Sequence, residues 1–179
     1  VAFVPAYILQ TEKFYDLIGS LTYSSVFAYC IYLTTTGDIN WGSLTISILV
    51  ILWAVRLGSF LFLRIAKDGK DKRFTTIKPD IAQFFMAWTI QGTWVALCSL
   101  CAITAIASET GIIINPIFYT GLLMFIGGLA IEIIADRQKT IFRAVPENRD
   151  KFITSGLWSR SRHPCLLYTS DAADDFTSV

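Results

Sequence analysis

The sequence is poor in the residues from which soluble metal sites and nucleotide sites are built. It has one histidine and four cysteines in 179 residues, and only 16% of its residues are charged. A zinc site needs about four clustered ligands, so a single histidine without clustered carboxylates predicts no metal centre. The chain also has no P-loop and no G-x-G-x-x-G motif, which excludes the usual soluble nucleotide-binding modules. A net charge of +1 provides no basic surface for nucleic acid, so none is expected as a partner.

Apolar residues are abundant instead. They make up 54% of the chain, and the mean hydropathy is +0.54. A soluble domain usually has about 45–50% apolar and about 25% charged residues. The charged residues lie in a few blocks between long apolar runs. This pattern is typical of a membrane protein with several spans.

Four apolar stretches are long enough to cross a bilayer, which takes about 20 residues. They are Leu17–Thr36, Leu44–Ile65, Ile81–Ala107 and Ile112–Ala135. The predicted fold class is therefore all-α, a helical membrane bundle with four complete transmembrane helices. The turn Ser108–Gly111 predicts a tight hairpin between the third and fourth spans, and the apolar segment Val1–Leu9 is typical of the end of a further helix.

Lysine and arginine residues outside the spans fall on one side of this topology. Loops 37–43 and 108–111 contain none, whereas the connection 66–80 and the segment after the fourth span are rich in both. The positive-inside rule places these basic segments in the cytoplasm. We therefore expect an integral membrane protein surrounded by lipid. The bacterial inner membrane and the endoplasmic reticulum both fit this orientation.

Arg56 and Gln91 are polar residues in the middle of predicted spans. Arg56 is near the middle of the second span, where insertion of arginine costs about 2.5–3.5 kcal/mol. It is expected either to face a wet cavity or to pair with a carbonyl or with Glu132. Gln91 lies mid-span in the third stretch, and hydrogen bonding between helices is the favoured interpretation of this residue taken alone.

A polar stripe is predicted where the fourth span leaves the membrane. At about 100° per residue, Glu132, Asp136, Lys139 and Arg143 lie within a sector of roughly 60° if the helix continues. One interpretation is a solvated helix surface with favourable spacing of acids and bases. The other is one wall of a site for an anionic ligand, where bases bind phosphates and acids accept hydrogen bonds from ribose or amide groups.

Six motifs, taken together in order and spacing, resemble a known family. They are Tyr15–Ser20, Trp53–Gly58, Lys67–Phe74, Gln91–Trp94, Glu132–Lys139 and Ser155–Pro164. The chain resembles the steroid 5α-reductase-like membrane proteins, specifically the branch known as DUF1295, over about residues 1–164.

The resemblance implies a membrane reductase that binds NADPH in a cytoplasmic-facing cavity. Such an enzyme reduces a carbon–carbon double bond conjugated to a ketone in a lipid-like, steroid-like substrate. The implied cofactor-binding residues are Glu132, Asp136, Lys139, Arg143, Arg160, Arg162, His163 and Arg73. A weaker correspondence assigns Arg56, Gln91, Trp94 and Tyr15 to the substrate cavity. The resemblance identifies no catalytic residue, and it implies no particular oligomeric state.

The end of the chain departs from the family pattern. In the family, the His-Pro pair is followed by Asn-Tyr and then by further spans, whereas here Cys165 and an acidic segment follow Pro164. We therefore expect a partial reductase-like domain over residues 1–164 and an atypical tail over residues 165–179. The sequence leaves open whether such a fragment is active by itself.

Two other function classes are kept as alternatives. Isoprenylcysteine carboxyl methyltransferases are similar to these reductases, carry an Arg-His-Pro segment and use S-adenosylmethionine. The bases of the stripe favour a phosphorylated dinucleotide over that cofactor. A non-enzymatic transporter or scaffold is the other class, with Arg56 and Glu132 as an intramembrane relay. The repeated halves with broken helices that are frequent in transporters are not found in the sequence.

Overall fold

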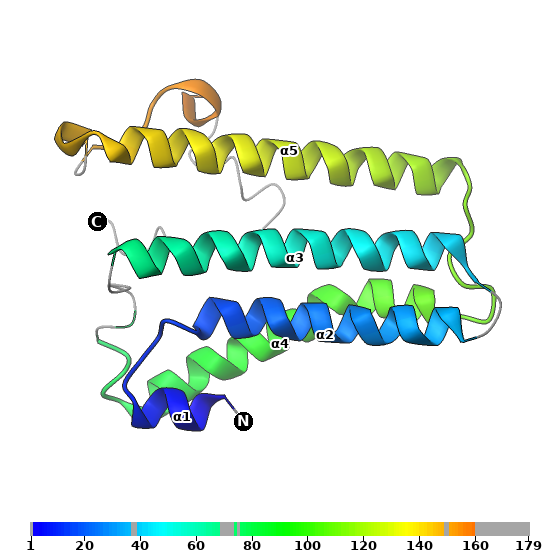
Figure 1. Cartoon of the computed structure of the whole chain (residues 1–179), viewed down its shortest axis with the longest axis horizontal. Coiled ribbons are helices and arrows are strands. Elements are labelled where there is room, and N and C mark those ends of the chain that lie inside the picture. Colours follow the sequence, from blue (N-terminus) through cyan, green and yellow to red (C-terminus); the bar gives the residue numbers. More distant parts are fainter. Residues whose placement is uncertain (1, 37–38, 69–73, 75, 149–150, 160–179) are drawn as a thin grey trace. The chain divides into compact units, whose positions relative to one another are not determined.

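The regular structure of this protein is helical throughout the described residues. The computed structural model describes residues 2–36, 39–68, 74, 76–148 and 151–159. The elements are α1 (Phe3–Ile8), α2 (Tyr15–Thr35), α3 (Trp41–Asp68), α4 (Ile81–Ile106), α5 (Pro116–Ala144) and two 3₁₀ turns, η2 (Pro146–Asn148) and η3 (Gly156–Ser159) (Figure 1). Helices α2 to α5 are each long and apolar enough to cross a membrane. The predicted all-α class and the four predicted spans are confirmed, and the chain is an integral membrane protein.

The chain forms two compact units, which are described separately. Unit 1 is Val1–Ile114 and contains α1 to α4, and unit 2 is Asn115–Val179 and contains α5 with the two turns. The predicted domain boundary between residues 164 and 165 lies outside the described residues.

The fourth span differs most from its prediction. Helix α5 begins at Pro116 rather than at Ile112, because Asn115 has an extended backbone and its side chain accepts a hydrogen bond from the Phe118 amide at 2.9 Å. Proline fits the first helical position, where no amide hydrogen is needed. The connection from α4 therefore runs over residues 107–115, and the predicted four-residue hairpin was too short. Helix α5 also continues past Ala135 to Ala144.

Helices α2 and α3 form an antiparallel hairpin in unit 1 (Figure 1). The Ser20 hydroxyl donates to the Ala54 carbonyl at 2.5 Å, and a side chain added at Gly58 would collide with Ser20. A small residue at this point allows the two backbones to approach each other, as is common between membrane helices. The buried core beside this contact consists of Tyr23, Phe27, Cys30, Ala54, Val95 and Ile106.

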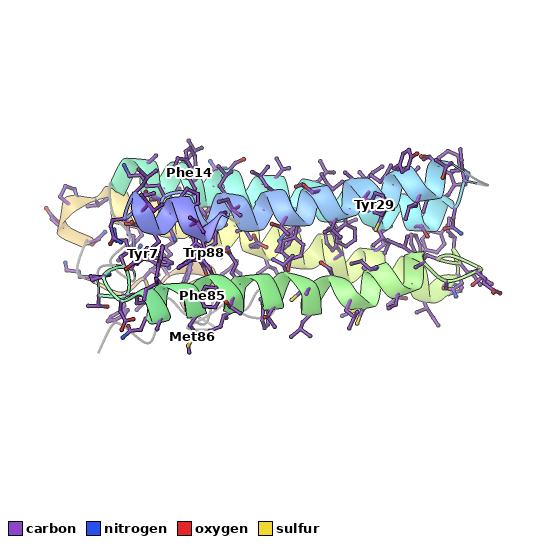
Figure 2. The ribbon with its side chains drawn as sticks, turned by 90° about the horizontal axis from the view of Figure 1, so that it is seen from below. Tyr7, Phe14, Tyr29, Phe85, Met86 and Trp88 are labelled. Carbon is purple, nitrogen blue, oxygen red and sulfur yellow. The ribbon has the colours of Figure 1, made fainter. Side chains whose placement is uncertain are left out.

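One end of unit 1 is closed by what we call the aromatic cluster, which consists of Phe3, Tyr7, Tyr15, Phe74, Phe84 and Trp88. Figure 2 shows Tyr7 and Trp88 at this end, with Tyr29 toward the other end of α2. Beside the cluster, the Lys78 ammonium forms an ion pair with the buried Glu12 carboxylate at 2.5 Å. The cluster and the ion pair join α1, the segment before α2 and the start of α2 to α4 and the segment that precedes it.

The opposite end of unit 1 brings together the two loops that contain no lysine or arginine. The Asn40 amide donates to the Thr110 carbonyl at 3.3 Å, and the Ile112 amide donates to the Ser43 hydroxyl at 3.2 Å. These bonds join the start of α3 to the segment that follows α4. The two loops that the charge pattern assigns to the same side of the membrane thus lie together.

Candidate functional site

The polar stripe lies on an unbroken helix. Because α5 runs from Pro116 to Ala144, the condition attached to the predicted stripe is met. Along it, Glu132 is buried, Asp136 and Lys139 are half-buried, and Arg143 is exposed in the last turn. The stripe thus changes along the helix from a buried acid to a solvated base. This order places the positive groups at the C-terminal end of α5.

The segment after α5 folds back onto the stripe. The Leu157 amide donates to the Gln138 side-chain oxygen at 3.0 Å, and the Trp158 indole N–H donates to the Ala135 carbonyl at 3.2 Å. Gly156 has a φ of +66°, and a Cβ there would lie 2.5 Å from the Gln138 amide nitrogen. We call these five residues (Ala135, Gln138, Gly156, Leu157 and Trp158) the clasp. Figure 1 shows the turn lying beside α5.

The clasp also places an aromatic ring against a base of the stripe. The Lys139 ammonium nitrogen lies 5.2 Å from the centroid of the Trp158 ring. A cation within about 6 Å of an indole face is attracted by the ring quadrupole. The Trp158 ring therefore contacts the Lys139 ammonium without neutralising its charge.

The sequence interpretation did not assign a role to Gln138 or Trp158. Both lie in motifs of the family resemblance, Glu132–Lys139 and Ser155–Pro164, but the resemblance implies roles only for charged residues of those motifs. The signal that could have found Trp158 is Gly156 two positions before it, since glycine suits a turn that needs positive φ.

Two of the predicted cavity residues meet in unit 1 as packing contacts. The Tyr15 hydroxyl donates to the Ala87 carbonyl at 2.8 Å, and the Gln91 amide donates to the Tyr15 carbonyl at 3.0 Å. Both bonds join α2 to α4, as the packing interpretation of Gln91 predicts. The Arg56 guanidinium is half-buried on α3, 6.0 Å from the Phe60 ring centroid, and Trp94 is exposed on α4.

Four predicted cofactor residues lie outside the described residues, namely Arg73, Arg160, Arg162 and His163. Their roles stay predictions. Within the part of the chain that the structure describes, no three His, Cys, Asp or Glu side chains gather into a group that could hold a metal ion.

The fold and this helix end define a helical membrane protein whose charged side chains gather where one span ends. The chain belongs to the family described as "Protein of unknown function (DUF1295)", whose sequence model matches residues 2–170. The DUF1295 resemblance is thereby confirmed.

A curated relative extends the comparison. The chain is 33% identical over 93 residues to the "Probable O-methyltransferase ustE" of Ustilaginoidea virens, and the match covers 44% of this chain and 33% of that protein. The chain thus spans about a third of the length of the curated relative it matches. No solved structure matches the chain.

Proposed function

We propose that the chain is part of a membrane-embedded, NADPH-dependent reductase of a conjugated carbon–carbon double bond in a lipid-like enone. The observation that supports this proposal is the end of α5, where two acids and two bases follow one helix face and the clasp brings a second segment beside them. Carboxylates accept hydrogen bonds from ribose hydroxyls, and lysine and arginine bind phosphate oxygens. This combination of acceptors and donors fits a phosphorylated dinucleotide.

Three residues of the stripe have assigned tasks in this proposal. Arg143 and Lys139 bind phosphate at the exposed end, and Asp136 orients a ribose through its hydroxyls. The half-buried setting of Asp136 and Lys139 lowers competition from water, which strengthens both contacts. When bound, NADPH would supply a hydride to the β-carbon of the enone, the displaced electron pair would pass to the carbonyl oxygen, and a proton taken up from water at the α-carbon would complete the reduction.

The proposed orientation places the stripe in the cytoplasm, where NADPH is available. It follows from the positive-inside rule, which also puts the two loops of unit 1 that contain no lysine or arginine on one common side, as the contact between them requires. The lipid substrate then enters from the bilayer, between spans, while the cofactor enters from water.

A second candidate is a membrane methyltransferase that uses S-adenosylmethionine. The name of the relative from Ustilaginoidea virens, a probable O-methyltransferase, favours the methyltransferase. S-adenosylmethionine carries a sulfonium cation and no phosphate. In that case the acids Glu132 and Asp136 would contribute more to cofactor binding than the bases Lys139 and Arg143. Loss of Arg143 therefore distinguishes the two candidates, since it weakens binding of NADPH but not of S-adenosylmethionine.

The test is a cofactor titration. The chain is purified in detergent, both alone and joined to the downstream spans of a complete family member, and is titrated with NADPH, NADH and S-adenosylmethionine. Saturable binding of NADPH supports the reductase. Binding of S-adenosylmethionine alone supports the methyltransferase, and absence of all binding by a folded, extended chain contradicts both.

Matched variants on α5 locate the binding. Arg143→Ala and Asp136→Ala are expected to raise the Michaelis constant for NADPH more than that for the lipid. Arg137→Ala is the control, because Arg137 is an exposed base of the same helix that lies off the stripe. Equal effects of Arg137→Ala and Arg143→Ala on the Michaelis constant for NADPH would show that the net charge of the helix end, rather than the position of Arg143, determines binding.

A further inference from the structure

The contact between Lys139 and the clasp leads to an inference that rests on the proposed function and deepens it. We propose that Trp158 is a positioning residue, which holds the Lys139 ammonium at the polar stripe in the geometry that receives an anionic group of the cofactor. Trp158 itself has no contact with the cofactor in this proposal and acts only through Lys139.

The turn that contains Trp158 is held to α5 by two hydrogen bonds, one from the ring and one from the backbone. Its indole N–H is bonded to the carbonyl of Ala135, a residue with no exposed surface, and the preceding amide of Leu157 is bonded to Gln138. Gly156 allows this turn because its φ of +66° suits a residue without a side chain. Since Lys139 follows Ala135 by one helical turn, the carbonyl that anchors the ring and the cation beneath it belong to the same face of α5.

An aromatic partner suits a phosphate-binding lysine better than an acidic partner does. A carboxylate would neutralise the ammonium and occupy its donors, whereas a ring face orients the ammonium and leaves its positive charge available to oxygen acceptors. A lysine side chain also loses rotamer freedom when it binds an anion. A ring that has already restricted the side chain reduces this loss, so the bound state is favoured by preorganisation.

The test compares two variants of Trp158 that lose the same hydrogen bond. Trp158→Phe and Trp158→Leu both lose the N–H bond to Ala135, but only Trp158→Phe retains a ring beside Lys139. Each is made with Lys139 intact and in the Lys139→Met background, and the Kd for NADPH is measured in detergent. We expect the leucine variant to bind about 2- to 5-fold more weakly than the phenylalanine variant, which corresponds to an exposed cation–π contact.

The Lys139→Met background separates positioning from mere folding. If Trp158 acts through Lys139, the difference between the phenylalanine and leucine variants disappears once the ammonium is removed. A difference that persists, or tighter NADPH binding in Trp158→Leu, overturns the proposal. If Trp158→Leu does not give a folded protein, Trp158→Met takes its place. Methionine also removes the ring, and its long, flexible side chain fills more of the space that the indole leaves.

A second readout needs no cofactor. The acylation rate of Lys139 by an amine-reactive ester is followed by mass spectrometry, with the exposed Lys151 as the internal reference. We expect Lys139 to react about 2- to 5-fold faster in Trp158→Leu than in Trp158→Phe. Equal rates contradict the positioning role. If the acylation rates differ as expected but the protein binds no NADPH, the proposed function is refuted, whereas the contact between Trp158 and Lys139 is supported.

Discussion

The two units use the same polar chemistry for different purposes. In unit 1, Gln91 donates from α4 to a backbone carbonyl of α2, so an amide joins two membrane spans. In unit 2, Gln138 accepts from the backbone of a turn that lies outside the spans, so an amide joins that turn to the end of a helix. The amide in mid-span therefore contributes to helix packing. The amide at the span end holds a neighbouring segment beside charged side chains. The predictions below test this division, with effects on stability expected in unit 1 and effects on binding in unit 2.

The largest expected effect is the loss of a ring from the aromatic cluster. Phe84 has no exposed surface and lies within 6.3 Å, centroid to centroid, of the rings of Phe3, Tyr7, Phe74 and Trp88. Phe84→Ala should lower the free energy of unfolding by about 3–5 kcal/mol, because the cavity removes contacts on all sides. The measurement is thermal or denaturant unfolding in detergent. Phe85→Ala is the control, since Phe85 is exposed, and a comparable loss there would contradict the expectation.

A smaller loss is expected from the ion pair beside the cluster. Lys78→Met removes the ammonium that pairs with the Glu12 carboxylate, which is 4% exposed. Removing one member of a buried pair costs about 3 kcal/mol, at the low end of the usual range because Lys78 retains some contact with water. The control is Lys13→Met at an exposed neighbouring position, and unfolding is again followed in detergent. Equal midpoints for the two variants would show that Glu12 is stabilised without Lys78.

A local effect is expected at the turn of the clasp. Gly156→Ala combines a left-handed backbone with a Cβ that collides with the Gln138 amide, which together cost about 2 kcal/mol. Amide hydrogen exchange of residues 155–159 should become faster, while the unfolding midpoint of the spans stays the same. Gly127→Ala is the control, because a Cβ there meets nothing within 4 Å and alanine favours a helix. Unchanged exchange in Gly156→Ala would mean that the turn is held by other contacts.

The spans were predictable because their signal is local and large. Twenty apolar residues are needed whatever the fold, so α2, α3 and α4 were found with ends that differ by three residues or fewer. The start of α5 was placed too early, since Ile112–Ile114 are as apolar as the span itself and only the cap at Asn115 determines where the helix begins. Hydropathy contains no information on caps, which depend on one hydrogen bond.

The site was predictable only in part, for a related reason. Helical periodicity is enough to align Glu132, Asp136, Lys139 and Arg143 once the helix is known to continue. The partners of those residues are tertiary contacts. The Trp158 ring reaches α5 across 23 positions of sequence, through a turn that depends on the backbone of Gly156. No periodic pattern encodes such a contact, so Gln138 and Trp158 were identified only from the structure.

The smallest effect sharpens the comparison most, because it uses the same substitution in both units. Gln91→Leu removes one bond between membrane helices, worth about 0.6 kcal/mol on average in such settings, and should leave NADPH affinity unchanged. Gln138→Leu removes the acceptor of the Leu157 amide and should leave the unfolding midpoint of the spans unchanged, while it speeds hydrogen exchange in the turn and weakens NADPH binding by about the same factor as loss of the Trp158 ring. Calorimetry measures the unfolding midpoint of both variants, and titration measures their affinity for NADPH. If the two leucine variants changed the same property, amides at the middle and at the end of a span would serve one purpose, and the division between the two units would fail.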